Sequence, residues 1–188
     1  MDKEDSRYYE EVVAKKRMFG GKIFDVEVEQ VILPNGIPAI RELVRHHGAV
    51  AIIPFTDDDK MIFVRQWREP MEQETLEIPA GKIDQDEGSD LQEVALREMN
   101  EELGLTTDKL EYVTKFYTSP GYSDERLTVF KAQNLKQVEN KRPLDSDEFL
   151  NVEKLTLDEA KEQIEKGVIC DSKSIYAVTY WELMNAKN

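Results

Sequence analysis

Three glutamates beside one arginine are the residues of this sequence most suited to chemistry. The segment "LREMNEEL" (96–103) places Glu98, Glu101 and Glu102 within two turns of an expected helix, next to Arg97. At about 100° per residue, these carboxylates continue an apolar stripe instead of lying opposite it. Carboxylates on a packed face need a cation, hydrogen bonds or raised pKa values. Arg97 neutralises about one charge, so the remainder indicates a hard divalent ion, Mg²⁺ or Mn²⁺.

A solvated acidic helix is the alternative interpretation, and for a glutamate-rich segment taken alone it is the commoner case. The preceding sequence changes the balance. "LEIPAGKIDQDEG" (76–88) contains a Pro79-Ala80-Gly81 turn and Gly88, where free backbone carbonyls and amides suit a metal or phosphate ligand. The two segments together favour a metal site.

The same residues carry a family resemblance. "REMNEELGL" (97–105) resembles the second half of the Nudix box of the Nudix hydrolases at every specified position. Gly81 and Glu87 match the first half, but nine residues instead of seven separate Glu87 from Arg97. This difference is interpreted as a two-residue insertion in the loop before the helix. The resemblance implies hydrolysis of a nucleoside diphosphate linked to another moiety, and it leaves that moiety open.

The resemblance also implies roles for individual residues. The Ala80 carbonyl and the side chains of Glu98 and Glu102 would bind the metal, Mg²⁺ or alternatively Mn²⁺, with Glu101 in a supporting catalytic role. Arg97 would orient a glutamate, either Glu101 or Glu98. Resemblance to one subgroup of the family implies that the general base comes from a loop that "LDSDEFLNV" (144–152) matches. Within this loop Glu148 is the first candidate, and the alternatives are Asp147 and Asp145.

Segments outside the box are similar to the ADP-ribose pyrophosphatase subgroup. They are "FVRQWREP", "ETLEIPAGKID" and "YTSPGYSDE" (117–125), which includes Pro120, 16 positions beyond Gly104. The resemblance implies an ADP-ribose substrate and the products AMP and ribose 5-phosphate. The substrate-binding residues would be Arg68, Glu77, Glu125, Arg41 and Phe24. The alternatives are another nucleotide sugar, such as GDP-mannose or ADP-glucose, or a Nudix-fold ligand sensor without hydrolysis.

The pattern of elements predicts an α+β fold, a Nudix α/β/α sandwich around a mixed β-sheet. The Asn35-Gly36 pair predicts a hairpin turn between two strands. One helix is expected from Ser89 or Asp90 to Gly104, and two more close the chain. The expected strands and closing helices are 22–33, 38–46, 48–55, 61–67, 110–118, 126–135 and 149–156, then 157–166 and 172–186.

Length and composition indicate how many domains the chain forms. A chain of 188 residues with 40% apolar content predicts one globular domain with a small appendage. By resemblance, residues 1–46 form an N-terminal antiparallel strand extension that makes a homodimer, and 47–188 form the hydrolase core. His46 and His47 are expected to be packing or surface residues, and Trp67 and Trp181 core or interface residues.

Charge and apolar patterning exclude several classes. The net charge of −14 argues against nucleic-acid binding. The longest mainly apolar run, 49–55, is too short to span a membrane, and the first ten residues do not resemble a signal peptide. Cys170 is the single cysteine, which excludes an internal disulfide. A cytoplasmic location is therefore expected.

Overall fold

The computed structural model describes residues 6–83, 90–144, 146 and 148–186. It divides into two compact units. Unit 1 comprises residues 1–48 and 116–127, and unit 2 comprises residues 49–115 and 128–188. The grouping of 116–127 with the N-terminal strands was not anticipated from the sequence.

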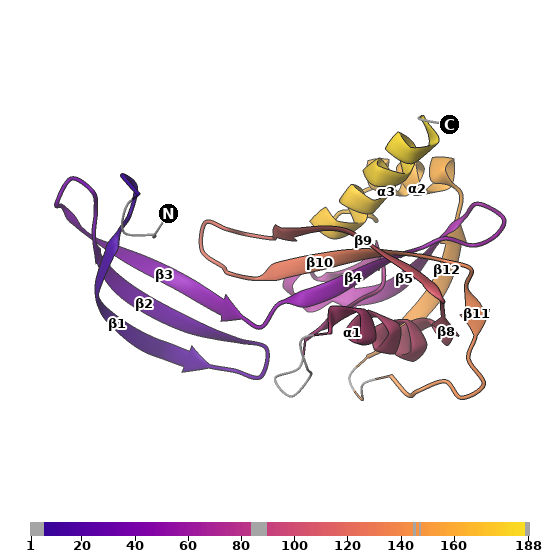
Figure 1. Ribbon diagram of the computed structural model, residues 1–188, viewed down its shortest axis with the longest axis horizontal. Helices are drawn as coiled ribbons and strands as arrows, with labels where there is room; N and C mark the ends of the chain where they lie inside the picture. The colour runs from indigo at the N-terminus through magenta and orange to yellow at the C-terminus, as the bar shows by residue number, and fades with distance from the viewer. Residues whose placement is uncertain (1–5, 84–89, 145, 147, 187–188) are drawn as a thin grey trace. The chain divides into compact units, whose positions relative to one another are not determined.

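Unit 1 is built on a three-stranded antiparallel sheet, β1 (Glu11–Gly20), β2 (Phe24–Ile32) and β3 (Pro38–His46), in that order (Figure 1). The predicted turn joins β2 to β3: Gly36 has a φ of 81°, which favours glycine, and its N–H donates to the Leu33 carbonyl at 2.8 Å. Strand β1 was missed because all its residues are exposed, so no apolar alternation marks it.

Residues 116–127 join unit 1 through the end of β3. The Val44 N–H donates to the Tyr122 carbonyl at 2.8 Å, and the Asp124 N–H donates to the Val44 carbonyl at 3.2 Å. The Asp124 carboxylate also accepts the His46 N–H at 2.8 Å. Backbone pairing across about 80 positions of sequence therefore places this segment beside β3.

Unit 2 has three layers (Figure 1). Its sheets have the strand orders β7-β4-β10-β9, β12-β5-β6 and β11-β8. Helix α1 lies on one face, and α2 and α3 lie on the other, which confirms the expected α+β sandwich. The bounds are β4 (Ala49–Pro54), β5 (Met61–Arg68), η2 (Glu69–Met71), β6 (Gln73–Glu77), β7 (Ala80–Lys82), α1 (Leu91–Glu98), η3 (Met99–Leu103), β8 (Leu105–Thr106), β9 (Lys109–Tyr117), β10 (Arg126–Gln133), β11 (Lys136–Gln137), β12 (Leu150–Leu155), α2 (Leu157–Glu165) and α3 (Ser172–Asn185).

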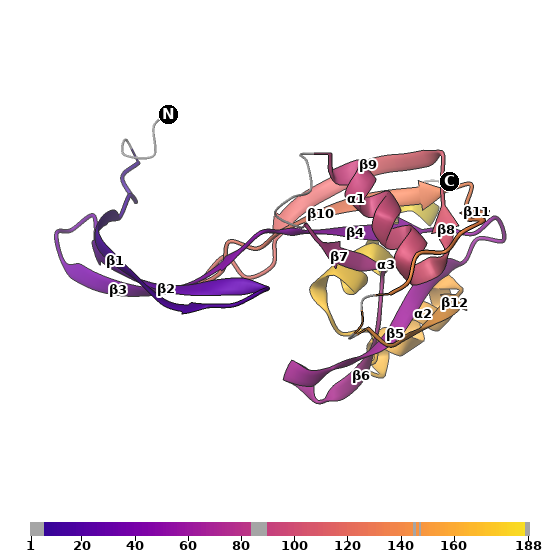
Figure 2. The same ribbon diagram turned by 90° about the horizontal axis from the view of Figure 1, so that it is seen from below.

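The helix that carries the glutamates is held by its ends and its apolar face. The Asp90 carboxylate caps α1 by accepting the Gln92 N–H at 2.9 Å. Helix α1 contacts β4 and β7 (Figure 2), and its Val94 and Ala95 join the buried core that includes Val50 of β4. The predicted helix is confirmed, but its second half, η3, is π-helical and ends at Gly104.

Apolar packing also holds the last helix, α3, against the core of unit 2. Trp181 of α3 is buried and meets Phe55 edge to face, with ring centroids 5.4 Å apart. Within the described residues, no helix is long and apolar enough to cross a membrane.

Candidate active site

Burial singles out two of the three glutamates. Glu98 is 7% exposed and Glu102 is 3% exposed, whereas Glu101 is half-buried. The predicted continuation of the apolar stripe by carboxylates is therefore confirmed for Glu98 and Glu102. A merely solvated acidic face would leave both exposed.

Gly81 explains how Glu98 reaches the backbone of β7. A Cβ atom built on Gly81 would lie 1.8 Å from Glu98 Cδ. Only glycine leaves room for this carboxylate, because any side chain at position 81 would overlap it. Ala80, whose carbonyl is the expected metal ligand, is the neighbouring residue in the same strand.

Arg97 contacts both glutamates that the sequence had left as alternatives. Its Nη1 lies 2.8 Å from Glu98 Oε1 and 2.7 Å from Glu101 Oε2. Its Nη2 also donates to the Lys82 carbonyl at 3.3 Å. Arg97 thus links the helix to β7 at Lys82.

The electrostatics of the buried pair favour the neutral acids when no cation is present. Burial raises the pKa of Glu98 to about 7; the Arg97 charge opposes this, and the Glu101 and Glu148 charges add to it. Burial and the charges of Glu98 and Glu148 raise the pKa of Glu102 well above its usual range, and Lys173 and Arg68 oppose this. The Oε2 atom of Glu102 is buried without a hydrogen-bond partner.

These features fit a divalent metal. A cation would supply the missing partner of Glu102 Oε2 and relieve the repulsion between the two carboxylates. Across the described ranges, no three His, Cys, Asp or Glu side chains form a metal-binding group. Two carboxylates with a backbone carbonyl still suit Mg²⁺, which usually keeps several waters and takes further oxygens from substrate phosphates.

The loop that carries Glu148 is fastened to η3. The Arg142 N–H donates to Asn100 Oδ1 at 2.8 Å, and Lys141 Nζ donates to the Glu102 carbonyl at 3.1 Å. Glu148 is exposed, and its charge contributes to the raised pKa of both Glu98 and Glu102. The alternative bases, Asp145 and Asp147, and the box residue Glu87 lie outside the described residues.

Arg68 and Glu77 form a bidentate ion pair in unit 2. Arg68 Nε and Nη2 each lie 2.7 Å from an oxygen of Glu77. Burial would raise the pKa of Glu77, but Arg68 and Lys173 outweigh it and lower that pKa to about 2. Sequence reasoning missed Lys173, which no motif marks.

The other three expected substrate residues lie in unit 1. Phe24 is 38% exposed and packs against Phe19, with centroids 6.1 Å apart. Arg41 forms a bidentate pair with Glu10, through contacts of 2.9 and 2.6 Å. Glu125 accepts a hydrogen bond from Thr118 Oγ1.

The remaining predicted residues divide between the interior and the surface. His46 is a packing residue: its Nδ1 accepts the Gly48 N–H at 2.9 Å, and only 11% of its side chain is exposed. Trp181 belongs to the core, as predicted. Trp67 lies outside the core, because it is 56% exposed and its Nε1 donates to Glu69 at 2.7 Å, and its other predicted role, at an interface, stays a prediction.

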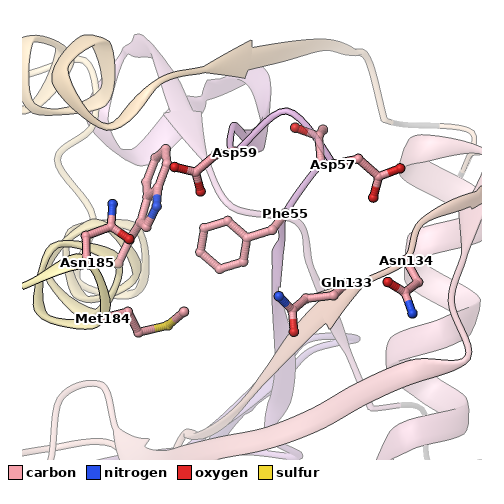
Figure 3. Close-up of a pocket in the computed structure, with 9 residues that line it drawn as sticks. Phe55, Asp57, Asp59, Gln133, Asn134, Met184 and Asn185 are labelled. Carbon is pink, nitrogen blue, oxygen red and sulfur yellow. The ribbon is translucent and has the colours of Figure 1, made fainter. Parts of the chain in front are cut away.

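A separate cavity of about 270 Å³ lies between the β4–β5 turn, the end of β10 and the last turn of α3 (Figure 3). Its polar lining includes the carboxylates of Asp57 and Asp59 and the amides of Gln133 and Asn134. None of the nine lining residues is Lys or Arg. A diphosphate would be repelled here, so the cavity does not compete with the glutamate site.

Known proteins match the chain along nearly its whole length. An ADP-ribose pyrophosphatase of Bacillus subtilis (strain 168) is 46% identical over 177 residues, covering 94% of this chain and 95% of that protein. A methanol dehydrogenase activator of Bacillus methanolicus is 41% identical, covering 95% and 96%. A solved structure titled as an ADP compounds hydrolase has the same fold, with a TM-score of 0.83, 22% identity and 98% of both chains covered.

The family model described as NUDIX domain matches residues 45–177. This range contains the buried glutamates, Gly81 and the Arg68–Glu77 pair. The chain is therefore a member of the Nudix hydrolase family.

Proposed function

We propose that this protein hydrolyses the diphosphate of ADP-ribose to AMP and ribose 5-phosphate, with Mg²⁺ or Mn²⁺ as its cofactor. The observation that carries the proposal is the buried Glu98–Glu102 pair, seated on Gly81 with one unpartnered oxygen. The similarity to an ADP-ribose pyrophosphatase along almost the full chain supports the choice of substrate.

The candidate site residues of unit 2 have distinct roles in the proposed reaction. Ala80, Glu98 and Glu102 would hold the metal, which when bound neutralises diphosphate charge and lowers the pKa of a water molecule. Arg97 fixes Glu98 and Glu101 against the backbone of Lys82. Glu148 would accept the proton of the attacking water. Arg68 would bind the diphosphate, held in place by Glu77.

Unit 1 would complete the enzyme as a homodimer. In this proposal residues 1–46 form the dimerisation extension and 47–188 the hydrolase core. Phe24 would stack on adenine, and Glu125 and Arg41 would contact substrate, with Arg41 exchanging its Glu10 partner for substrate. The single cysteine is compatible with a reducing compartment, and we place the enzyme in the cytoplasm without nucleic-acid or membrane partners.

A substrate panel with product analysis tests the function. ADP-ribose, ADP-glucose, GDP-mannose, NADH and diadenosine compounds are incubated with the protein and Mg²⁺, and products are identified by mass. We expect AMP and ribose 5-phosphate from ADP-ribose at the highest kcat/KM. Preference for GDP-mannose or ADP-glucose would reassign the substrate, and inactivity on the whole panel would favour a ligand sensor.

The Glu102→Gln variant tests the metal site. It keeps the size of the side chain and removes the charge that would bind the metal, so we expect the fold to persist. Turnover should fall by about 10²-fold or more. A folded Glu102→Gln protein with near-normal turnover would rule out this metal site.

A further inference from the structure

Lys173 joins the site from an unexpected element, the first turn of α3. Its Nζ donates to Glu77 Oε2 and, at 2.9 Å, to Asp171 Oδ1. The side chain is 13% exposed. Asp171 is the N-cap of the same helix and also accepts the Ser174 N–H at 3.1 Å.

Glu77 is shared between two cations. Its Oε1 accepts from Arg68 Nε and Thr75 Oγ1, at 2.7 and 2.6 Å. Its Oε2 accepts from Arg68 Nη2 at 2.7 Å and from Lys173 Nζ. All the hydrogen-bonding capacity of this buried carboxylate is therefore used, so it has little freedom to turn.

The pairing leaves one edge of Arg68 for a ligand. Its Nε and Nη2 are occupied by Glu77, and within the part of the chain that the structure describes no group bonds to Nη1. The side chain is 41% exposed. A guanidinium held on one edge and open on the other is preorganised for a phosphate oxygen.

Without Lys173, two carboxylates would compete for this guanidinium. Asp171 would lose the cation at Oδ1, and its Oδ2 is already buried without a partner. The charge of Asp171 already acts on Arg68. An unpaired Asp171 would thus draw Arg68 away from its alignment with Glu77.

We propose that Lys173 is a positioning residue for substrate binding: by pairing with Asp171 and Glu77 it keeps Arg68 aligned, with its open edge available to the diphosphate. This inference rests on the proposed function. It assigns α3 a part in recognition, although α3 lies outside the Nudix box.

A double-mutant cycle on binding tests this role. The probe is the α,β-methylene analogue of ADP-ribose with Mg²⁺, and Kd is measured by calorimetry. Lys173→Met should weaken binding about tenfold, whereas Lys173→Arg, which keeps the charge, should weaken it less. In an Arg68→Met background, Lys173→Met should have almost no further effect. Steady-state kinetics should show a raised KM with kcat changed less.

Charge compensation separates positioning from a general loss of structure. The pair Lys173→Met with Asp171→Asn removes both charges and keeps a helix-capping side chain, so it should recover most of the lost affinity. Lys173→Gln replaces Lys173→Met in the cycle if the methionine variant does not fold. The matched control is Lys161→Met, which breaks an exposed pair with Glu182 in the same unit and should leave Kd unchanged.

Two results would overturn the inference. One is an unchanged Kd for folded Lys173→Met, and the other is an equal loss of affinity with and without Arg68. A wild-type protein that does not bind the analogue would instead remove the substrate assignment itself. Failure of the role given to Lys173 is therefore distinguishable from failure of the proposed function.

Discussion

At the scale of a single residue, Gly81 decides whether Glu98 can approach the backbone of β7. We expect Gly81→Ala to displace the Glu98 carboxylate, because the added Cβ would overlap Cδ. A displacement of about 1 Å at a catalytic group can cost on the order of 10² in rate. Activity assays should show a lower rate of hydrolysis, and Mg²⁺ titration calorimetry should show weaker metal binding.

The control for Gly81→Ala is Gly121→Ala, whose added Cβ would meet no atom within 4 Å. It should leave thermal stability and metal binding unchanged. Normal Mg²⁺ affinity in the Gly81→Ala protein would contradict the role given to Glu98.

Glu98 should also make the stability of the metal-free protein depend on pH. Its pKa is about 7 in the folded protein against an ordinary 4.5. The folded state therefore holds more protons between these values, so stability falls as pH rises from about 4.5 to 7. The gap corresponds to on the order of 3 kcal/mol. Thermal unfolding from pH 5 to 8 should show this loss, and a Glu98→Gln protein should show less of it.

Mg²⁺ should reverse the trend, because in the proposed site it would bind the ionised carboxylates. Its stabilising effect should thus increase as pH rises through 7. The same pH slope in wild-type and Glu98→Gln proteins would exclude Glu98 as the titrating group. Glu77 does not affect stability between pH 5 and 8. Its pKa is lowered from 4.5 to about 2 in the folded protein, so the stability that it contributes is lost only as the pH falls below about 4.5.

At the scale of elements, the sequence located the helix that carries the three glutamates but not its geometry. Asp90 and Gly104 indicated its ends, since a capping carboxylate and a residue with a φ of 67° have clear sequence preferences. The π-helical turn of η3 has no such signature. The sequence also did not predict that Lys173 belongs to the site, because its contact with Glu77 joins positions 96 residues apart in the chain.

The attachment of the Glu148 loop to η3 leads to a prediction at this scale. Asn100→Ala removes the acceptor of the Arg142 N–H, a contact worth about 1 kcal/mol. We expect kcat to fall roughly three- to tenfold with little change in Mg²⁺ affinity, because the loop loses its alignment while the metal ligands stay in place.

Gln92→Ala, an exposed change on α1, is the matched control in the same steady-state assay. It should leave kcat unchanged. An Asn100→Ala enzyme with the same kcat as this control would show that the hydrogen bond does not position Glu148, the proposed base.

At the scale of the whole molecule, the sequence predicted the sandwich of unit 2 more fully than the make-up of unit 1. Strand β4 is buried along its length, and its continuous apolar run made it recognisable. Strand β1 is exposed along its length and carries no alternation. The segment 116–127 joins unit 1 through backbone bonds to Val44, which side-chain patterns do not encode.

The exposed apolar residues of unit 1 lead to the last prediction, a homodimer. Val12, Val13, Met18, Phe19 and Ile40 are each about half exposed on the three-stranded sheet. Such a concentration on one small sheet is typical of a protein interface. We expect light scattering to give twice the mass of the chain, and Val13→Asp with Phe19→Asp to give a monomer.

A homodimer would also bear on catalysis, because Phe24 and Arg41 lie on the same sheet. If they contact substrate across the interface, the monomeric variant should show a raised KM for ADP-ribose. Its Mg²⁺ affinity should be unchanged, because every proposed metal ligand lies in unit 2. Leu183→Asp, a charge placed at an exposed apolar position of α3, should leave both mass and KM unchanged. A monomer with wild-type KM would show that Phe24 and Arg41 do not act across an interface.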